Sequence, residues 1–511
     1  MADKKYYITT PLYYVNAKPH IGHAYTNILC DTFARFRRYL GEDVFFMTGT
    51  DEHGTKIEKA ARDQNMEPKK YVDEMVPHFK DLWEQLGIQY DYFIRTTDED
   101  HKETVRKVLE DLGARGELYK DNYQGWYSVK SETFYAKAEL VDGKCPDTGG
   151  EVQEIVEENY FFRMSKYQDW LMDYIRKNPD FIQPEIRRNE ILGFLKQPLQ
   201  DLCITRPKER LSWGIPYPSS PEHVIYVWFD ALINYVSGVG YKRNEDQFSR
   251  YWPADVHVVG KDIVRHHAVY WPIMLKACGV QMPHKVLAHG WWTLAGAKVS
   301  KSSGNIVDPI ELIRKYGVDA FRYFLLREVT IGYDGAYSED LLRQRYTSDL
   351  ANDLGNLWFR VASMLAKYFG AVVPHADTLE SEGLIRETYA LWEKVREPMM
   401  AYDPRSALEA IWAVITSANQ YVEENKPWVL AKDPKSKERL ALVLATLTEC
   451  VAHVAVLLVP FLPKTAQSML AGLKLSSDGV MNADKFSRPL LRKGTQVERG
   501  DALFPRMEVE A

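Results

Sequence analysis

The sequence contains little cysteine, and no two of its cysteines stand close together. There are five in 511 residues: Cys30, Cys145, Cys203, Cys278 and Cys450. Positions scattered in this way do not form the framework of a disulfide-rich protein, and they favour a reducing cytoplasm. The first residues also lack a long apolar region followed by a cleavage site, so we expect no signal peptide. We therefore expect a cytoplasmic protein.

Basic residues are not in excess either. The chain has 65 lysines and arginines against 71 aspartates and glutamates, which gives a formal net charge of −6. This balance excludes a generally basic surface of the kind that coats nucleic acid. Any contact with RNA must therefore come from local basic or aromatic patches.

One long apolar run, residues 441–462, has a length that could span a membrane. Glu449 and His453 interrupt this run, and Pro460 lies near its end. Polar side chains of this kind are costly inside a bilayer, whereas a bundle of helices can bury an apolar helix on all sides. We predict a buried helix in a bundle, and we expect no membrane partner.

The first fifty residues alternate between the patterns of strand and helix. Residues 6–10 predict a strand, and from Gly22 to Leu40 apolar side chains recur at helical spacing. A second strand is predicted at residues 43–48. Strand, helix and strand at this spacing predict a parallel sheet that binds ligands near the carboxyl ends of its strands.

The α/β pattern is interrupted and then resumes. Between about residues 116 and 221, short aromatic-rich strands and a turn region rich in Gly, Asp and Pro predict an inserted α+β domain. A strand at 256–259, a helix at 262–277 and a strand at 285–288 continue the α/β pattern. From about residue 338 onward the pattern is helical.

A chain of this length with 45% hydrophobic residues can form two to four domains. The predicted fold is a Rossmann-like α/β domain with a parallel sheet, split by an α+β insertion and followed by an α-helical bundle. The predicted boundaries are 1–115 and 222–290 for the two halves of the α/β domain, 116–221 for the insertion, 291–345 for a loop and linking region, 346–478 for the helical domain and 479–511 for a tail.

Two histidines and a glycine stand where the first strand meets the first helix. His20, Gly22 and His23 lie at the start of this helix, whose unpaired N–H groups and positive dipole end suit phosphate. Histidines there can donate to phosphate oxygens, and Gly22 lets a ligand approach the backbone. On this segment alone, a surface turn with incidental histidines is an equal alternative.

A second phosphate-binding element is predicted at residues 298–304. Lys298, Ser300 and Lys301 follow a strand and a turn of small residues. Lysines on such a loop can close over a triphosphate and stabilise the negative charge that develops in a transition state. Taken alone, an ordinary solvated loop explains the same residues.

Together, these two elements resemble the HIGH and KMSKS signatures of class I aminoacyl-tRNA synthetases, with Val299 in the place of Met. Further blocks resemble those of the methionyl-tRNA synthetase family, and the resemblance covers most of the chain. They are residues 11–16, residues 48–54, residues 226–231 with Tyr235, and residues 260–267.

The resemblance implies a methionine–tRNA ligase. Such an enzyme activates L-methionine with ATP, accompanied by Mg²⁺, to methionyl-adenylate and pyrophosphate. It then transfers methionine to the 3′ end of tRNA(Met), including the initiator tRNA. The residues whose positions match those that bind ATP are His20, Gly22, His23, Gly260, Asp262, Lys298, Ser300 and Lys301, of which His20, His23, Lys298 and Lys301 match the catalytic positions.

The methionine site is likewise implied by the resemblance. Its residues are Leu12, Tyr14, Asp51, Trp228, Tyr235, Ile263 and His267. A thioether requires an apolar, polarisable pocket, and sulfur packs well against aromatic rings. Asp51 would hold the ammonium group of the substrate. Without the resemblance, core packing is the simpler interpretation of Trp228 and Tyr235.

Many family members carry a zinc knuckle in the inserted domain, with two pairs of ligands. Here Ser128 and Ser131 occupy the first pair, and the second keeps only Cys145. Zinc requires about four thiolate or imidazole ligands, so one thiolate cannot hold it. We expect no metal ion and no structural zinc in this connective-peptide insertion.

The helical domain contains residues that match the anticodon-recognition positions of the family. Asn356 and Arg360 are four residues apart and share one helical face, and Trp428 follows later. An amide and a guanidinium can read base edges, and an exposed indole can stack on an unpaired base. A solvated helix face is the alternative. Because no room remains for the additional C-terminal domain of many bacterial relatives, we expect a monomer.

Three other functions remain possible at this point. The chain could be a class I synthetase for leucine, isoleucine or valine, although an insertion of about a hundred residues is short for their editing domains. It could be an inactive paralogue that only binds RNA, although His20, His23, Lys298 and Lys301 are all intact. It could also be a nucleotidyltransferase that acts on another carboxylate, although such enzymes usually lack a helical anticodon domain.

Overall fold

The computed structural model describes residues 4–128, 130, 133–135, 137–294, 297–298, 307–374, 379, 382–476 and 481–507. Its central element is a six-stranded parallel sheet in the order β3-β2-β1-β11-β12-β7. The strands are β1 (Lys5–Tyr14), β2 (Asp43–Asp51), β3 (Tyr92–Arg95), β7 (Ile182–Gln183), β11 (Val256–Gly260) and β12 (Val286–His289). The sheet is therefore built from segments on both sides of the insertion, as predicted.

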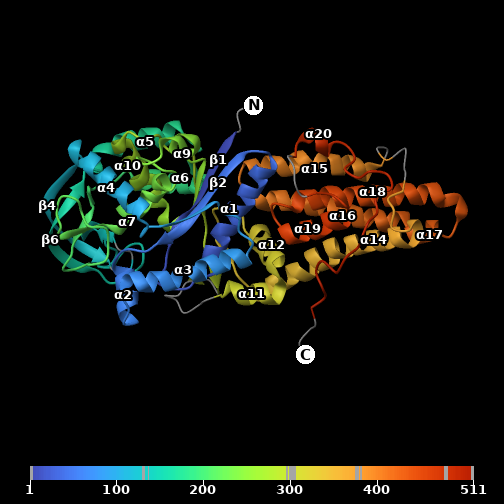
Figure 1. Cartoon of the computed structure of the whole chain (residues 1–511), viewed down its shortest axis with the longest axis horizontal. Coiled ribbons are helices and arrows are strands. Elements are labelled where there is room, and N and C mark those ends of the chain that lie inside the picture. Colours follow the sequence, from blue (N-terminus) through green and yellow to red (C-terminus); the bar gives the residue numbers. More distant parts are fainter. Residues whose placement is uncertain are drawn as a thin grey trace.

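Both faces of this sheet are buried, because successive side chains of a strand point to opposite sides. Tyr6 and Ile8 of β1 join the core on one face, and Tyr7 joins the core on the other. Helices α1 (Ile21–Tyr39) and α3 (Pro68–Gln85) cover the first face, toward the helical bundle (Figure 1). Helices α4 (Glu99–Ala114) and α10 (Trp271–Cys278) cover the second.

The insertion contains an antiparallel sheet in the order β5-β4-β6-β8 and a pair formed by β9 and β10. Its strands are β4 (Leu118–Ser128), β5 (Thr133–Tyr135), β6 (Gln153–Phe162), β8 (Leu202–Cys203), β9 (Thr205–Pro207) and β10 (His223–Ile225), and its helices are α5 (Gln168–Lys177) and α6 (Glu185–Phe194). Between these helices, β7 pairs with β12 and so joins the central sheet. The segment 168–194 therefore packs against the α/β domain, which the sequence pattern did not indicate.

The predicted helix at 262–277 is not a continuous α-helix. A 3-10 turn (Lys261–Ile263) is followed by a π-helical segment (His266–Tyr270) and then by α10. Pro272, in the first turn of α10, has no N–H group to donate to the preceding turn, and its ring crowds the carbonyl there. The wider π turn accommodates this, and it sets the orientation of His266 and His267.

A linking region joins the α/β domain to the bundle. It contains the small sheet β14-β13-β15 and helices α11 (Pro309–Tyr316) and α12 (Val318–Glu328). The strands are β13 (Trp292–Leu294), β14 (Ala297–Lys298) and β15 (Gly335–Ala336). Helix α12 packs against α1 on one side and against α16 and α19 on the other.

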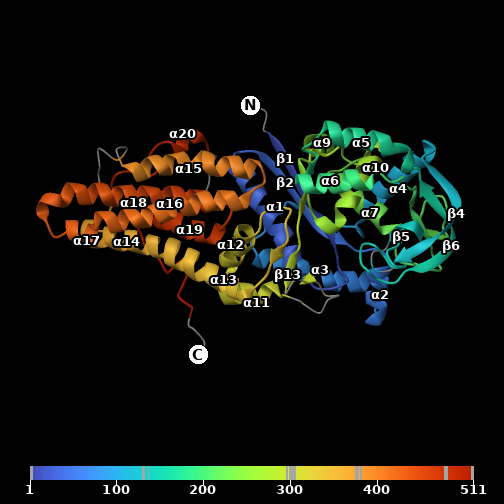
Figure 2. The same ribbon diagram turned by 180° about the vertical axis from the view of Figure 1, so that it is seen from behind.

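The helical bundle forms the end of the molecule opposite to the insertion (Figure 2). It contains α13 (Glu339–Arg345), a π-helical segment (Tyr346–Gly355), α14 (Asn356–Phe369), α15 (Gly383–Met400), α16 (Pro404–Asn425), α17 (Pro427–Leu430), α18 (Lys437–Leu458), α19 (Pro463–Gly472) and α20 (Ala483–Phe486).

Helix α18 contains the long apolar run of the sequence. Within the described residues, the helical segment 434–458 is long and apolar enough to cross a membrane by length and composition, and 89% of its most apolar window is buried inside the fold. Helices α15, α16 and α19 surround it. The prediction of a buried helix in a bundle is confirmed.

The C-terminal strap (residues 486–507) returns across the bundle. The Glu449 carboxylate accepts hydrogen bonds from the Leu490 and Leu491 N–H groups, at 2.6 and 3.2 Å. Further along, the Trp358 Nε1–H donates to the Arg499 carbonyl at 2.9 Å, and the Tyr346 hydroxyl donates to that of Pro505 at 2.7 Å. The strap is thus part of the bundle.

Candidate active site

The two predicted histidines cap helix α1 with their own rings. The His20 Nδ1 accepts a hydrogen bond from the Gly22 N–H at 3.0 Å, and the His23 Nδ1 accepts one from the His20 N–H at 3.2 Å. The rings stack with their centroids 3.9 Å apart. Because both Nδ1 atoms are acceptors, each neutral ring carries its proton on Nε2. The cap thus leaves Nε2–H as the donor of each ring.

A cavity of about 420 Å³ opens at this end of the sheet, where the strands β1, β11 and β12 terminate. The predicted residues that line it come from three separate parts of the sequence: Leu12, Tyr14, His20, Gly22, His23, Gly260, Asp262 and Ile263. Gly22 has little space for a side chain, since a Cβ there would lie 2.9 Å from the His20 ring. Predicted ATP-binding and methionine-binding residues therefore share one cavity.

The other predicted methionine residues lie behind this cavity. Trp228 packs edge-on against Tyr14, with ring centroids 6.3 Å apart, and Asp51 is the neighbour of Tyr14 on the adjacent strand β2. Tyr235 and His267 are wholly buried and do not line the open cavity. The structure therefore brings all seven residues into one cluster, of which Leu12, Tyr14 and Ile263 face the cavity.

His267 is held as a neutral ring. Burial lowers the pKa of His267 to about 4. Its Nδ1 lies 2.8 Å from the Ile263 carbonyl and its Nε2 lies 2.6 Å from the Tyr235 hydroxyl. Since a carbonyl can only accept, Nδ1 donates and Nε2 accepts from Tyr235. The pair is thus satisfied internally and presents a rigid, uncharged wall.

A buried carboxylate positions the element that carries Trp228. Asp230, on α7 (Val227–Leu232), lies 2.7 Å from the His53 Nδ1 and 2.7 Å from the His101 Nε2. Burial raises the pKa of Asp230, but the two histidines outweigh it and hold this pKa below its usual range. The network connects α7 to the residues that follow β2 and to α4, so Trp228 has a fixed support.

The predicted lysine loop lies largely outside the described residues. These omit Ser300, Lys301 and the side chain of Lys298. The backbone of Lys298 belongs to β14 and pairs with Thr293 of β13, next to Trp292, which lines the cavity. The loop therefore begins beside the cavity, as the predicted role requires.

Two family models together match nearly the whole chain. The model described as tRNA synthetases class I (M) matches residues 6–156 and 149–362, and the anticodon binding domain of methionyl tRNA ligase matches residues 373–511. The chain belongs to the methionyl-tRNA synthetase family. The fold class and the enzyme class predicted from the sequence, a class I methionine–tRNA ligase, are confirmed.

Individual relatives agree with this membership. The methionine–tRNA ligase of Caldanaerobacter subterraneus is 50% identical over 510 residues, which cover 99% of this chain and 80% of the relative. That of Bacillus subtilis is 46% identical and covers 99% of this chain and 79% of its own. The Mycobacterium tuberculosis methionyl-tRNA synthetase in complex with methionyl-adenylate superposes with a TM-score of 0.94 at 42% identity, over 98% of this chain and 100% of its own.

The cavity of this family member also contains residues that the sequence patterns did not single out. They include Lys18, Lys56, Lys130, Thr148, His289 and Trp291. Lys18 and Lys56 each lie two residues from a recognised motif, so their positions offered a signal. Lys130 and Thr148 belong to the insertion, and only the tertiary fold brings them to the cavity. Three added lysines make the rim suitable for a polyphosphate.

In the knuckle region of the insertion, backbone hydrogen bonds close the turn at residues 145–150. The Cys145 N–H donates to the Gly150 carbonyl at 2.9 Å, and the Gly149 N–H donates to the Cys145 carbonyl at 2.8 Å. Cys145 is buried, whereas Ser131 lies outside the described residues. Among the residues that the structure describes, no group of three or more His, Cys, Asp or Glu side chains could hold a metal ion.

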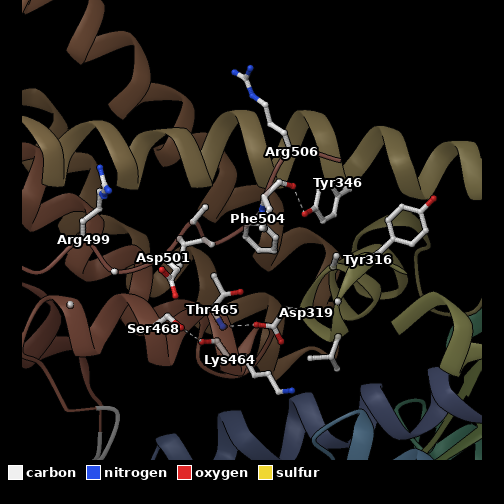
Figure 3. A pocket seen from close by; sticks show the side chains of 18 of the residues that line it. Tyr316, Asp319, Tyr346, Lys464, Thr465, Ser468, Arg499, Asp501, Phe504 and Arg506 are labelled. Carbon is white, nitrogen blue, oxygen red and sulfur yellow. Dashed lines mark hydrogen bonds between the residues drawn. The ribbon is translucent and has the colours of Figure 1, made fainter. Parts of the chain in front are cut away.

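A second cavity, of about 810 Å³, lies between α11, α12, α19 and the C-terminal strap (Figure 3). Tyr346 and Asp319 each hold one of its walls: Tyr346 donates to the Pro505 carbonyl, and the Asp319 carboxylate accepts from the Thr465 N–H at 2.6 Å. No predicted site residue lines this cavity.

In the bundle, two of the three predicted anticodon residues are in contact. The Arg360 guanidinium lies 5.7 Å from the centre of the Trp428 ring, and it pairs with Glu423 at 2.6 Å. Trp428 is 36% exposed, which is unusual for an indole in a packed bundle. Asn356, one turn before Arg360, is exposed at the start of α14.

Proposed function

We propose that this chain activates L-methionine with ATP and transfers it to the 3′ end of tRNA(Met), including the initiator tRNA, as a cytoplasmic monomer without a membrane partner. The observation that carries this proposal is the cavity itself. It joins the capped helix N-terminus of His20 and His23 to the methionine cluster around Tyr14 and Ile263. A phosphate site and an apolar amino-acid site within one cavity suit adenylate formation.

The first step is an in-line displacement at phosphorus. A carboxylate oxygen of methionine attacks the α-phosphorus of ATP, a carbon–oxygen–phosphorus link forms, and the bond to pyrophosphate breaks. The Nε2–H groups of His20 and His23 donate to the phosphate oxygens as charge accumulates there. Catalysis then consists mainly of positioning and charge stabilisation.

Residues around the cavity complete this arrangement. Lys298, Ser300 and Lys301 approach the polyphosphate from the loop, and Mg²⁺ accompanies ATP as its counter-ion. Gly260 allows the nucleotide to approach the backbone at the end of β11, and Asp262 accepts hydrogen bonds from the ribose hydroxyls.

The amino-acid site selects methionine by packing. Leu12, Tyr14 and Ile263 line the cavity, and Trp228, Tyr235 and His267 support it from behind. The thioether lies among aromatic edges, where a polarisable sulfur is stabilised. Asp51, at the end of β2, binds the substrate ammonium by a charge-assisted hydrogen bond.

The second step transfers the amino acid to RNA. A ribose hydroxyl at the 3′ end of the tRNA attacks the carbonyl carbon of the adenylate, and AMP leaves. At the other end of the molecule, Asn356 and Arg360 read base edges of the anticodon, and Trp428 stacks on an unpaired base. The exposure of Trp428 supports this role.

The insertion performs its role without zinc. Of the two pairs of aligned ligand positions, Ser128 and Ser131 occupy the first and the second keeps only Cys145, which is the one good zinc ligand. Backbone hydrogen bonds and side-chain packing take the place of the metal. Elemental analysis of chelator-washed protein should find less than about a tenth of a zinc ion per chain; a stoichiometric amount would contradict the proposal.

Substrate profiling tests the proposed function directly. Purified protein is assayed for ATP–pyrophosphate exchange with each of the twenty amino acids, and then for charging of purified tRNA(Met). We expect exchange and charging with methionine alone. A higher exchange rate with leucine, isoleucine or valine would identify a different synthetase, and RNA binding without any exchange would identify an inactive paralogue.

A further inference from the structure

A carboxylate of the linking region, Asp334, contacts two segments at the edge of the 420 Å³ cavity. Asp334, directly before β15, pairs with the Lys261 ammonium at 2.7 Å and accepts a hydrogen bond from the Trp291 N–H at 2.9 Å. Lys261 follows β11, and Trp291 precedes β13. One side chain thus joins three segments that are distant in the sequence.

The contact continues from Trp291 to the residue proposed for the ribose. The Trp291 Nε1–H donates to the Asp262 carboxylate at 3.1 Å, and the Lys261 ammonium lies 4.0 Å from the centre of the Trp291 ring. Trp291 and Asp262 both line the cavity, whereas Asp334 and Lys261 do not. Asp334 therefore reaches the nucleotide site only through other residues.

The backbone fixes Asp334 relative to Trp291. The Gly335 N–H donates to the Trp291 carbonyl at 2.8 Å, and β13 pairs with β15 in the register Trp292 with Gly335. At Gly290 an added Cβ would lie 2.0 Å from the Tyr333 carbonyl oxygen, so the two loops are in direct contact. Neither loop can shift without displacing the other.

The charge of Asp334 suits this arrangement. Burial raises its pKa, but Lys261 and the Trp291 N–H outweigh this effect and hold the pKa below its usual range. The carboxylate is therefore ionised at neutral pH. Its partner, the Lys261 side chain, is only 18% exposed, so water screens the ion pair weakly. A charge-assisted contact of this kind is stronger than a neutral one.

We propose that Asp334 is a positioning residue for the nucleotide: it orients Lys261 and Trp291, and through the Trp291 indole it fixes the Asp262 carboxylate for the ribose hydroxyls. This inference rests on the proposed ribose role of Asp262. Asp334 makes no contact with ATP, and its effect on the reaction passes through the indole N–H. The linking region, which also carries the lysine loop, thereby contributes to ribose recognition.

The first measurement compares Asp334→Ala with a matched control. We expect Asp334→Ala to raise the KM for ATP in pyrophosphate exchange by about tenfold, with kcat changed less than about twofold and the KM for methionine unchanged. The control is Asp340→Ala, which removes a carboxylate of the same segment that pairs with Arg343 at the surface, at 2.7 Å. It should leave all three constants unchanged. An unaltered KM for ATP in Asp334→Ala would overturn the inference.

The second measurement separates positioning from general damage. The kcat/KM for ATP is compared with that for 2′-deoxy-ATP and 3′-deoxy-ATP, since these analogues lack the hydroxyls that Asp262 would bind. The preference for ATP over the more strongly rejected analogue should fall at least about fivefold in Asp334→Ala. Equal losses with ATP and both analogues would overturn the inference, even if thermal melting shows an intact fold.

A substitution at the indole completes the test. Trp291→Phe keeps an aromatic ring but removes the Nε1–H, so it should reduce the same preference. The double variant should lose no more than the larger single effect, because both changes break one chain of contacts; fully additive losses would contradict it. A parent enzyme without methionine-dependent exchange would instead show that the proposed function itself is wrong.

Discussion

His20 and His23 show how a binding residue can also be a structural one. Each ring uses Nδ1 to satisfy a backbone N–H at the start of α1. The cap therefore sets the tautomer of both rings, which line the cavity, before any substrate arrives. Donors that are already in place need no rearrangement when negative charge develops in the transition state. This preorganisation is the main source of electrostatic catalysis.

The substitution His20→Asn separates these two roles. Asparagine is among the best N-cap residues, so the helix should keep its cap and the melting temperature should change by less than about 2 °C. The shorter side chain cannot reach a phosphate, so the kcat of pyrophosphate exchange should fall about a hundredfold or more. His284→Asn, at an exposed histidine, is the matched control and should retain full activity. If His20→Asn kept full activity, the imidazole would have no role beyond capping.

Among the elements, α12 joins the α/β domain to the bundle. Its Arg322 is fully buried and pairs with Asp31 of α1 at 2.8 Å. The same guanidinium donates to the Phe461 carbonyl at 2.9 Å and to the Pro460 carbonyl at 3.2 Å, in the turn between α18 and α19. One side chain thus connects the helix that carries the histidines to the bundle.

Removal of this guanidinium should be costly. Arg322→Met leaves Asp31 buried with only Arg35 as a charged partner, at 2.7 Å, and removes a donor from the Phe461, Pro460 and Leu86 carbonyls. A broken buried ion pair costs about 3–5 kcal/mol, so thermal unfolding should begin several degrees lower. The control Arg343→Met breaks a surface pair and should cost less than about 1 kcal/mol. Equal effects of the two substitutions in calorimetry would show that Arg322 does not connect the domains.

For the helices and strands, the sequence predicted those elements that depend on a local pattern of residues. The strands β1 and β2 and helix α1 follow from the strand pattern and from helical spacing, and α18 follows from its long and largely apolar run. The π-helical segment before Pro272 breaks a pattern that looks continuous, and β7 is too short to produce one. Trp291 and Asp334 contact each other across about forty residues, and such pairs leave no periodic signal in a single sequence.

Over the whole molecule, the central sheet and helix α17 lie far apart along the long axis (Figure 1). The cavity belongs to the sheet, whereas Trp428 lies on α17, at the far end of the bundle. No small molecule can contact both. Only a large substrate such as tRNA can contact the cavity and Trp428 at the same time. This separation fits a reaction whose first step needs the cavity alone and whose second step also needs the bundle.

Trp428→Ala should therefore affect the two steps differently. A base stacked on an aromatic side chain contributes about 1–3 kcal/mol, so kcat/KM for tRNA charging should fall about ten- to a hundredfold. Methionine-dependent pyrophosphate exchange should remain nearly intact, because no tRNA takes part in it. The neighbouring Val429, 50% exposed, provides the control Val429→Ala. Equal loss of exchange and charging in Trp428→Ala would refute the anticodon assignment.

The C-terminal strap has a consequence for how the chain is made on the ribosome. The Trp358 indole of α14 donates to a carbonyl that is synthesised 141 residues later, and the Tyr346 hydroxyl donates to one that is synthesised 159 residues later. During translation the bundle therefore remains unfinished until residues 499–505 have left the exit tunnel. A nascent chain halted before residue 499 should expose α14 to chaperones and proteases, whereas the sheet, complete once β12 has emerged, should already be folded.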